Sequence, residues 1–359
     1  MTLLLTNADL EQIVIAPSDI VDAMEVAYRE LHTGAARSEL RGRMIVPDAN
    51  PARDDTYFFG YHIGAVPAFG HAALRFDSLF AGHVADEFGG RHIRTSDFAG
   101  LVLLFSLENA ELVGILHDHW LSTRRVAATT ALGASYLARR DSRRLGLFGT
   151  GTQARQTIPM MLARFDLDEI VVFSPDRSHR EQFVSDMSSV TGSRIRSVDS
   201  PHDAASNMDI VVCATNSSTP VLEASWLSEG THLSVIVSGG EGDSQAVRSE
   251  IDTETVCRAD VIVVNSIAQI QKSRQVKLLR PIESGRLNWD QIYELAAVVS
   301  GDAPGRSSPA QITLFDNNSG MGIQFAALGT LVLDAAASMG LGTNLDTEMF
   351  MTRGGNYAP

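Results

Sequence analysis

The stretch RRLGLFGTGTQARQTIPMMLARFDLDEIVVFSPDRS, residues 143–178, decides the fold. A short apolar run over 145–148 leads directly into a turn that contains two glycines. Apolar residues then recur at helical spacing, and a second apolar run follows at 169–173. The order of strand, glycine turn, helix and strand is typical of the first unit of a dinucleotide-binding domain.

The small residues of this turn stand where a bound dinucleotide requires them. Gly149 makes the tight turn, Gly151 lets backbone amides approach a pyrophosphate, and Ala154 lets the helix pack closely against the strand. The start of the helix adds unpaired N–H groups and the positive end of its dipole. We predict a dinucleotide site here, and the alternative is a tight turn that binds no ligand. The predicted cofactor contacts also include Thr152, Gln153, Thr215, Ser238 and Asn317.

Runs rich in valine and isoleucine recur from residue 145 onward. They lack polar alternation, which is the pattern of strands buried on both faces of a parallel sheet covered by helices. The fold class predicted for this part is therefore α/β, with a doubly wound parallel sheet of the Rossmann type. The predicted strands cover 145–149, 169–173, 194–198, 209–215, 231–237 and 260–265.

Residues 1 to about 120 follow a different pattern. A helix is predicted to begin with Ser18 as its N-cap and to end at Gly34. Alternating segments follow, with a hairpin turn at 108–111, so this region is predicted to be mixed α+β with a partly antiparallel sheet. Near the other end of the chain, residues 320–342 are apolar on most faces. They predict a buried helix that packs on the first region or on a second subunit.

The end of the second predicted strand bears on the choice of cofactor. Ser174 stands where an acidic residue would bind the ribose hydroxyls of NAD, and Arg177 and Arg180 lie close by. A small hydroxyl with arginines nearby accepts a 2′-phosphate well, so the sequence favours NADP(H). Asp176, two residues after the serine, keeps NAD(H) as the alternative.

The composition favours a small-molecule partner. The chain has 359 residues, enough for two domains, and its net charge of −14 repels nucleic acid phosphates. No apolar run approaches the roughly 18 residues that cross a bilayer, and no secretion signal is evident. We therefore expect a cytoplasmic protein with no membrane or nucleic acid partner. Cys213 and Cys257 lack metal-type spacing and are expected to be buried structural thiols.

Two adjoining segments resemble a known family. LSTRRVAATTALGASYLAR, residues 121–139, precedes LGLFGTGTQA, residues 145–154, and together they resemble the ornithine cyclodeaminase and mu-crystallin family. The resemblance continues through residues 249–266 and 311–329. It implies a homodimer in which a dinucleotide domain, residues 123–315, is inserted in a substrate-binding and dimerisation domain, residues 1–122 plus 316–359. It also implies hydride transfer between a nicotinamide and the α-carbon of an amino or imino acid.

The resemblance extends to two candidate substrate-binding arginines. Arg125 matches the arginine of the family's Arg-Thr-Ala-Ala segment, although Val126 replaces the threonine here. Its implied role is a clamp for a carboxylate or a pyrophosphate. Arg43, or alternatively Arg41, lies where the family has a second carboxylate-binding arginine. For both positions, a solvated surface arginine is the alternative.

The sequence departs from the family at three places. Arg75 replaces a lysine that the family usually presents to the substrate, and arginine can anchor a carboxylate but is a poor acid or base. Cyclodeaminases have an aspartate farther along the sequence. Glu241 and Asp243 are both close to that position, but neither matches it clearly. The pair Asn317 and Asn318 replaces a small-residue turn. These amides suit the nicotinamide pocket, and plain helix caps are the alternative.

The proton donor is left open among four histidines, His62, His71, His117 and His119. His119 or Asp118, just before the arginine helix, is the candidate expected to face the cleft, and a purely structural histidine is the alternative. The sequence has no His-Glu-x-x-His motif, cysteine cluster or acid pair with metal spacing, so we predict no catalytic metal.

These inferences lead to a functional hypothesis with two rivals. We predict an NAD(P)-dependent oxidoreductase that interconverts an imino acid and an amino acid. The three arginines Arg43, Arg75 and Arg125 suggest a substrate with one or two carboxylates, similar to iminosuccinate. A cyclodeaminase, which has no net redox change, is the first rival. A non-catalytic, cofactor-dependent binding protein is the second.

Overall fold

The computed structural model of the protein describes residues 1–47, 49–50, 56–85, 91–237, 239–240 and 249–352. In these residues, two eight-stranded sheets form the framework. The first sheet is mixed and has the order β16-β1-β7-β6-β5-β4-β2, with β3 paired to β4. In the described part of this sheet, β1 and β7 are the one parallel pair, and the other pairs are antiparallel. Its strands are β1 (Thr2–Leu5), β2 (Arg37–Ser38), β3 (Gly42–Val46), β4 (Thr56–Val66), β5 (His71–Ala85), β6 (Arg91–Ser106), β7 (Leu112–His117) and β16 (Thr343–Leu345).

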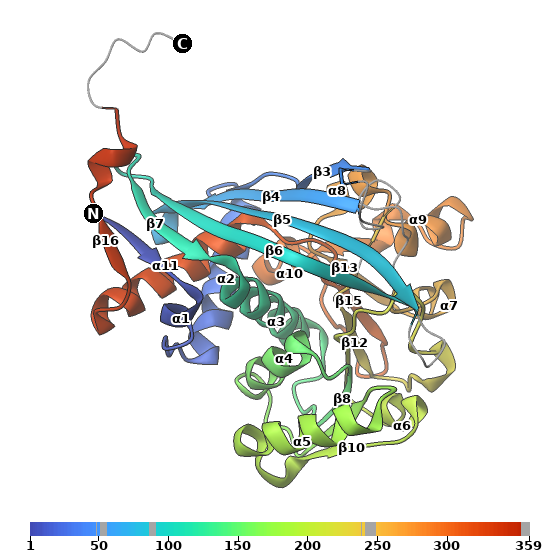
Figure 1. Ribbon diagram of the computed structural model, residues 1–359. Helices are drawn as coiled ribbons and strands as arrows, with labels where there is room; N and C mark the ends of the chain where they lie inside the picture. The colour runs from blue at the N-terminus through green and yellow to red at the C-terminus, as the bar shows by residue number, and fades with distance from the viewer. Residues whose placement is uncertain (48, 51–55, 86–90, 238, 241–248, 353–359) are drawn as a thin grey trace.

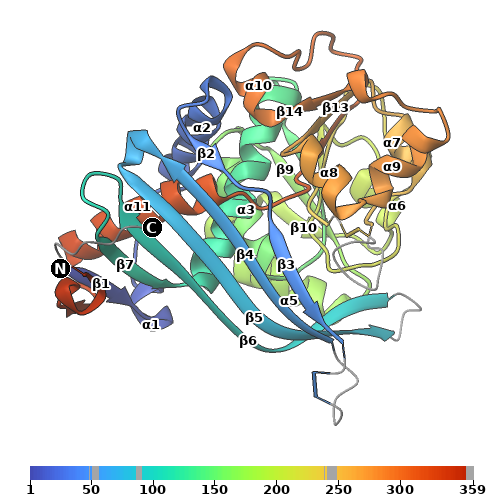
Figure 2. The ribbon, with the colours of Figure 1, turned by 90° about the horizontal axis from the view of Figure 1, so that it is seen from above.

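Helices cover one face of this sheet. They are α1 (Asn7–Leu10), α2 (Pro17–Thr33), α3 (Asp118–Leu137) and α11 (Gly322–Met339) (Figure 1). The view in Figure 2 looks onto the opposite face, where β3, β4, β5 and β6 lie in front of these helices. The expected hairpin turn at 108–111 joins β6 to β7, and Ser106 N–H donates to the Glu111 carbonyl across it.

The second sheet is entirely parallel, with the order β10-β9-β8-β11-β12-β15-β13-β14. Each of the six predicted valine- and isoleucine-rich runs contains a strand. The strands are β8 (Arg144–Phe148), β9 (Glu169–Phe173), β10 (Ile195–Ser197), β11 (Ile210–Cys213), β12 (His232–Val235), β13 (Val261–Val264), β14 (Ile292–Glu294) and β15 (Thr313–Asp316). Its helices are α4 (Thr152–Leu162), α5 (Arg177–Thr191), α6 (Pro201–Ala205), α7 (Thr253–Cys257), α8 (Ile267–Ser273), α9 (Val276–Glu283) and α10 (Leu295–Ser300).

Successive side chains of the parallel strands enter two different cores. In β11, Ile210 and Val212 belong to the core shared with the first sheet, whereas Val211 and Cys213 belong to a second core on the opposite face. Burial on both faces explains why these strands lack polar alternation. The predicted fold class, a Rossmann-type parallel sheet combined with a mixed α+β region, is confirmed.

Strand β15 connects the two sheets. Its four buried residues lie between β12 and β13, in the middle of the parallel sheet, and the chain then passes into α11 under the mixed sheet. The sequence analysis did not predict this strand or β14. Residues just after β15 therefore lie where the two sheets meet, at the carboxyl edge of the parallel strands. Ligands bind at this edge in open α/β folds.

Two expectations about helices need correction. The N-cap of α2 is Ala16 and not Ser18, because Pro17 occupies the first helical position and its fixed φ suits a helix start. Gly34 ends α2 as predicted, with φ +78°. Contrary to expectation, α11 is long and apolar enough to cross a membrane, yet 61% of it is buried within the protein. It packs on β4 and β5, the first of the two predicted alternatives.

Candidate functional site

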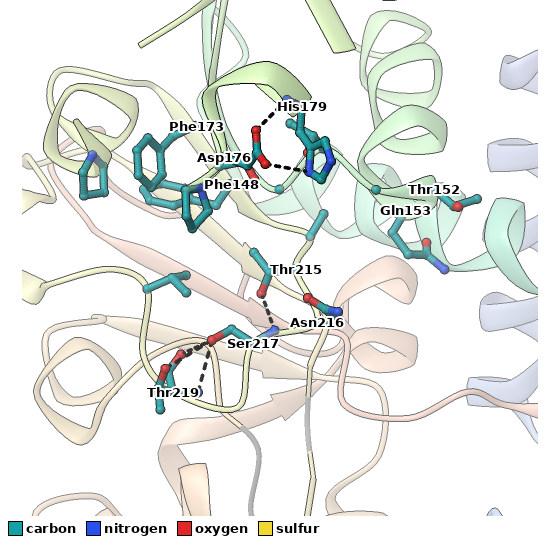
Figure 3. A pocket seen from close by; sticks show the side chains of 18 residues that line it. Phe148, Thr152, Gln153, Phe173, Asp176, His179, Thr215, Asn216, Ser217 and Thr219 are labelled. Atoms are coloured by element: carbon teal, nitrogen blue, oxygen red, sulfur yellow. Dashed lines mark hydrogen bonds and ion pairs between the residues drawn. The ribbon is translucent and has the colours of Figure 1, made fainter. Parts of the chain in front are cut away.

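A hollow of about 880 Å³ opens at the carboxyl ends of β8, β9 and β11 (Figure 3). The glycine turn forms one side of it. Gly149 has φ +105°, and a Cβ at this position would lie 2.4 Å from the Ala214 carbonyl oxygen, so only glycine fits. The lining residues are Phe148, Gly149, Thr150, Gly151, Thr152, Gln153, Phe173, Ser174, Pro175, Asp176, His179, Pro201, Ala214, Thr215, Asn216, Ser217, Thr219 and Val221.

The turn fits a pyrophosphate. Gly151 is the N-cap residue of α4 and makes no side-chain cap, so the first N–H groups of this helix are left for a ligand. Apart from the two neighbours of Gly151 in the chain, no described residue has an atom within 4 Å of the position that a Cβ on Gly151 would occupy. Ala154 is fully buried beneath the turn. Gln153 also lines the hollow, and its buried Oε1 has no hydrogen-bond partner in the described part of the chain.

A buried carboxylate holds the far wall of the hollow. Glu250 Oε1 accepts hydrogen bonds from the Thr215 N–H at 2.8 Å and from the Thr215 hydroxyl at 2.6 Å. Its Oε2 accepts from the N–H groups of Ile236 and Val237, both at 3.0 Å. Burial raises the pKa of Glu250, although these four hydrogen bonds oppose the shift. The carboxylate thus joins the loops that follow β11 and β12. The sequence analysis missed Glu250, because its partners are distant in the chain.

The residues that bear on cofactor choice occupy different positions. Ser174 and Asp176 line the hollow, and Asp176 caps α5 by accepting from His179 N–H at 3.0 Å (Figure 3). Arg180 is buried, donates to the Ser174 and Pro175 carbonyls, and pairs with Asp199 at 2.7 Å. Arg177 is exposed and pairs with Glu181 at 2.7 Å. Neither arginine lines the hollow. Ser238, Glu241 and Asp243 lie outside the described residues.

The two asparagines after β15 belong to a buried network of amides. Asn317 Nδ2 donates to the Val126 carbonyl and the Thr130 hydroxyl of α3, both at 3.1 Å. Its Oδ1 accepts from Asn265 at 2.6 Å. Asn318 Oδ1 accepts from the backbone N–H of Asn265 at 2.9 Å. In the described residues, these side chains join β13, β15 and α3, and they do not line the hollow.

A cationic cluster lies beside this network, under the mixed sheet. Arg125 of α3 donates to Gln324 Oε1 at 3.0 Å, and its guanidinium carbon lies 5.1 Å from the centre of the Phe325 ring. Its Nε is buried and has no partner among the described residues, and no described carboxylate pairs with it. Burial and the nearby Arg75 lower the pKa of Arg125 to about 10. A buried, unneutralised guanidinium is suited to bind an anion.

Gln324 was not anticipated from the sequence. Its Oε1 accepts from Arg125 and from the Met321 N–H at 3.0 Å. Its Nε2 donates to the Tyr28 hydroxyl at 2.9 Å and the Thr129 hydroxyl at 3.0 Å. Four hydrogen bonds therefore fix this amide and, through it, the guanidinium of Arg125. No local pattern marks such a residue, because its partners come from α2, α3 and the start of α11.

Arg75 pairs with carboxylates of the protein itself. It donates from Nε and Nη2 to Asp118, at 3.0 and 2.6 Å, and from Nη1 to Asp77 at 2.9 Å. Burial alone would lower the pKa of Arg75, but these two carboxylates outweigh it and raise the pKa. Asp118 is fully buried. Its role here is to hold Arg75, which leaves it little freedom to face the cleft as a proton carrier.

The other predicted substrate residues divide into near and distant ones. Arg41 lowers the pKa of both Arg125 and His62. Arg43 lowers the pKa of His62, but it is exposed and stacks on Phe58, 5.5 Å from the ring centre. These positions therefore favour Arg41 over Arg43 as the second carboxylate-binding arginine, together with Arg125. His119 is exposed at the start of α3 and donates its backbone N–H to His117 Nδ1 at 3.4 Å.

Of the remaining histidines, His71 lies 2.9 Å from the Thr330 hydroxyl, and His62 lies within the arginine cluster. No group of three or more His, Cys, Asp or Glu side chains suited to a metal ion occurs among the residues that the structure describes. The two cysteines form no disulfide; Cys213 is buried and Cys257 is partly exposed.

The fold and these features define a protein with a Rossmann-type domain, whose cleft suits a dinucleotide, and with a buried cluster of arginines under its mixed sheet. The chain belongs to the ornithine cyclodeaminase/mu-crystallin family, whose model matches residues 90–340. The resemblance inferred from the sequence is thus confirmed.

Three relatives illustrate the range of the family. An uncharacterized cyclodeaminase of Sinorhizobium fredii is 28% identical over 343 residues, 95% of this chain and 97% of that protein. An alanine dehydrogenase of Archaeoglobus fulgidus is 26% identical over 347 residues, 96% of this chain and 98% of that protein. The structure of Thermococcus litoralis Δ1-pyrroline-2-carboxylate reductase in complex with NADH and L-proline matches with a TM-score of 0.82 and 26% identity. That match covers 96% of this chain and all of the other.

Proposed function

We propose that this protein is an NAD(P)-dependent oxidoreductase that reduces an α-imino acid to an amino acid, or catalyses the reverse reaction. The observation that carries the proposal is the buried Arg125 guanidinium, which has no carboxylate partner among the described ion pairs. The carbonyl of the next residue, Val126, accepts from Asn317 at the carboxyl end of β15, in the parallel sheet whose cleft fits a dinucleotide. An imino acid offers a carboxylate next to the carbon that accepts a hydride. The cationic cluster and the cleft therefore meet the two needs of this reaction.

The residues of this chain perform binding and orientation. The turn from Gly149 to Gln153 would hold the pyrophosphate, and the wall at Thr215 would support the remainder of the dinucleotide. Arg125, with Arg41 nearby, would bind the substrate carboxylate. When bound, the dinucleotide supplies the hydride that the substrate α-carbon receives. The protein then has to provide the proton for the nitrogen.

The charges around Arg125 support a substrate with one or two carboxylates. Arg41, Arg43, Arg75 and Arg125 act on His62, and Asp77 and Asp118 pair with Arg75. Either a monocarboxylate or a dicarboxylate would bring negative charge to this arginine-rich cluster, so both classes belong in a substrate screen.

We propose NAD(H) as the preferred form of the cofactor, in place of the NADP(H) favoured by the sequence. Asp176 lines the cleft, and its carboxylate repels a 2′-phosphate but accepts hydrogen bonds from ribose hydroxyls. The buried Arg180 is engaged with two carbonyls and Asp199. Arg177 has the freedom to turn toward a phosphate, because its pair with Glu181 is exposed.

We propose that two chains associate through the uncovered face of the mixed sheet. Met44, Tyr61 and Ile63 are 53%, 38% and 41% exposed on this face, and Phe59 and Phe76 stack beside them. Exposed apolar side chains on one face are typical of an interface between subunits. We also propose that the chain forms two domains, residues 1–122 plus 316–359 and residues 123–315. We propose a cytoplasmic location for the protein. A sedimentation measurement that gives a monomer would contradict the dimer.

One relative is called a cyclodeaminase, so this rival needs a direct test. NADH and NADPH are each supplied to the protein with cyclic imino acids, and with 2-oxo acids plus ammonia or methylamine. Ornithine and lysine are assayed in parallel for ammonia release with oxidised cofactor. Net loss of reduced-nicotinamide absorbance with any imine establishes the reductase. Ammonia release from a diamino acid at constant absorbance establishes the cyclodeaminase, and no turnover with any of them leaves the binding protein.

A further inference from the structure

His62 has an unusual position for a histidine with a purely structural role. It lies on the buried face of β4 and is only 5% exposed. The neighbouring residues on the same face are Gly60 and Gly64, which carry no side chain to cover the ring. The Phe325 ring lies 5.6 Å away on the α11 side. The imidazole is enclosed, because Asp77 occupies the space over Gly60 and the start of α11 occupies the space over Gly64.

The surroundings of both ring nitrogens of His62 bear on whether the ring can contact a ligand. Nδ1 is buried and has no hydrogen-bond partner among the described residues. Nε2 lies 2.8 Å from the point that a Cβ on Gly320 would occupy, and Arg125 Nη1 lies 2.7 Å from that same point. His62 and Arg125 thus converge over a residue that has no side chain. An anion bound to Arg125 at this place comes within reach of the imidazole.

Charged groups approach His62 from each neighbouring element. Arg75 is directly opposite it on β5, where Asp77 and the Asp118 carboxylate of α3 hold the Arg75 guanidinium. Arg125 approaches from α3, and Arg41 and Arg43 approach from the segment around the start of β3. Burial and these four arginines lower the pKa of His62 well below its usual value. The ring is accordingly neutral at pH 7 while no anion is bound.

We propose that His62 donates the proton to the substrate nitrogen, and that the substrate carboxylate bound to Arg125 charges this histidine for the purpose. This inference rests on the proposed reductase function and names its acid. The carboxylate neutralises part of the positive field, so the imidazole takes up a proton when the imino acid binds. The acid is then formed only in the presence of its substrate.

The proposed step balances as follows. The imidazolium N–H bond breaks, and its proton forms the new N–H bond of the product. The electron pair of the C=N π bond goes to the nitrogen, while the α-carbon receives a hydride from the reduced dinucleotide. The imidazole is left neutral and regains a proton from solvent in the next cycle. In the reverse direction, the neutral imidazole accepts the proton from the amino acid nitrogen.

The other candidate proton donors among the described residues either make other contacts or are distant. Asp118 holds Arg75, and the Tyr28 hydroxyl donates to Asn265 at 2.8 Å while it accepts from Gln324. Burial raises the pKa of Tyr28, which disfavours its loss of a proton. His119 is exposed at the start of α3. Among the histidines that the structure describes, His62 is the one that lies beside Arg125.

The direct test measures the titration of His62 by NMR. The full chain, labelled with ¹⁵N-histidine and bound to NAD⁺, is titrated with and without saturating pyrrole-2-carboxylate, a planar probe that carries a carboxylate. His62→Gln assigns the signal by its disappearance. We expect the probe to raise the His62 titration midpoint by at least one pH unit. A midpoint that does not move, or a probe that does not bind, overturns the coupling.

Kinetics test the proton transfer separately. We expect His62→Gln to lower kcat for imine reduction at least 100-fold and to leave the Kd for NADH unchanged, and His119→Gln to change neither. A His62→Gln variant that keeps its kcat overturns the assignment. A wild-type chain that shows the NMR shift but reduces no imine refutes the proposed function and retains the carboxylate-coupled histidine. The two failures are therefore distinguishable.

Discussion

Arg75 and Asp118 form a two-point ion pair, with Nε and Nη2 of the guanidinium 3.0 and 2.6 Å from the two carboxylate oxygens. The pair is buried and joins β5 to the first turn of α3, the helix that carries Arg125. Because Arg75 also holds Asp77, all three of its nitrogens contact carboxylates of the chain. This arrangement favours Arg125 as the main anchor for a substrate carboxylate, and gives Arg75 the role of holding the helix in place.

Replacing Arg75 should destabilise the protein. Arg75→Met leaves Asp77 and Asp118 buried without their cation, so we expect the free energy of unfolding to fall by about 3–5 kcal/mol. Urea denaturation measures this loss. The double variant Arg75→Met/Asp118→Leu should recover part of it, because one of the two stranded carboxylates is gone. A single variant as stable as the wild type would contradict a structural role for the pair.

Replacing Arg125 should separate binding from stability. Arg125→Met removes a charge-assisted hydrogen bond worth about 1.5–3 kcal/mol, so KM for an imino acid should rise at least tenfold. The ligand-free variant should be as stable as the wild type or more so, because a buried cation without a described carboxylate is lost. Arg124→Met is the matched control, since Arg124 stacks on Trp120 at 3.9 Å. An equal rise in KM for both variants would refute the anchor.

The two glycines of the turn should respond differently to alanine. Gly151→Ala should leave the melting temperature unchanged, since nothing lies within 4 Å of the new methyl group, but should raise KM for the cofactor at least tenfold by crowding the pyrophosphate. Gly149→Ala should destabilise the fold itself, because of φ +105° and the clash with the Ala214 carbonyl. Equal effects of the two substitutions on melting temperature would contradict this assignment.

Asp176 should control the choice between the two dinucleotides. In Asp176→Ser, the repulsion of a 2′-phosphate is gone and the serine still caps α5, so kcat/KM with NADPH relative to NADH should rise at least tenfold. Arg177→Ala should lower the use of NADPH and leave NADH unaffected. A wild-type protein that prefers NADPH, with no change in Asp176→Ser, would restore the preference inferred from the sequence.

Stability should fall as the pH is lowered below 6.5. His232 is fully buried between the hydroxyls of Thr313 and Ser234, and burial lowers its pKa to about 3. The unfolded chain therefore binds this proton below pH 6.5, while the folded chain does not until about pH 3. The loss from this residue is about 1.4 kcal/mol per pH unit within that window. His232→Gln should have a shallower slope between pH 5 and 7, and an unchanged slope would argue against a neutral His232.

Features set by local sequence could be predicted, and features set by distant pairing could not. The glycine turn and the valine-rich strands are local patterns, and they define the parallel sheet and the cofactor cleft. Strand β15 has only four residues, and its central place depends on pairing with β12 and β13, far away in the sequence. No pattern within 311–329 marks it as a strand rather than a loop before a helix.

The same distinction applies to the site. Arg125 was found through the resemblance, but the role of Arg75 depends on Asp118, 43 residues away. His62 was one of four candidate histidines, and only the register of β4 against β5 brings it opposite Arg75. The preference for NADP(H) rested on Ser174 with Arg177 and Arg180 nearby, and Arg180 is engaged elsewhere. Its pairing with Asp199, across α5 and β10, could not be read from the strand end itself.

Transfer of a labelled hydride tests imine reduction most directly. The protein is incubated with NADH deuterated at the transferred position and a cyclic imino acid, and the product is analysed by mass spectrometry. We expect an amino acid one mass unit heavier, with deuterium on the α-carbon, formed in equal amount to the NAD⁺ produced. Ammonia formed from ornithine without net NADH oxidation, together with no labelled amino acid from any imine, would contradict the proposed reaction.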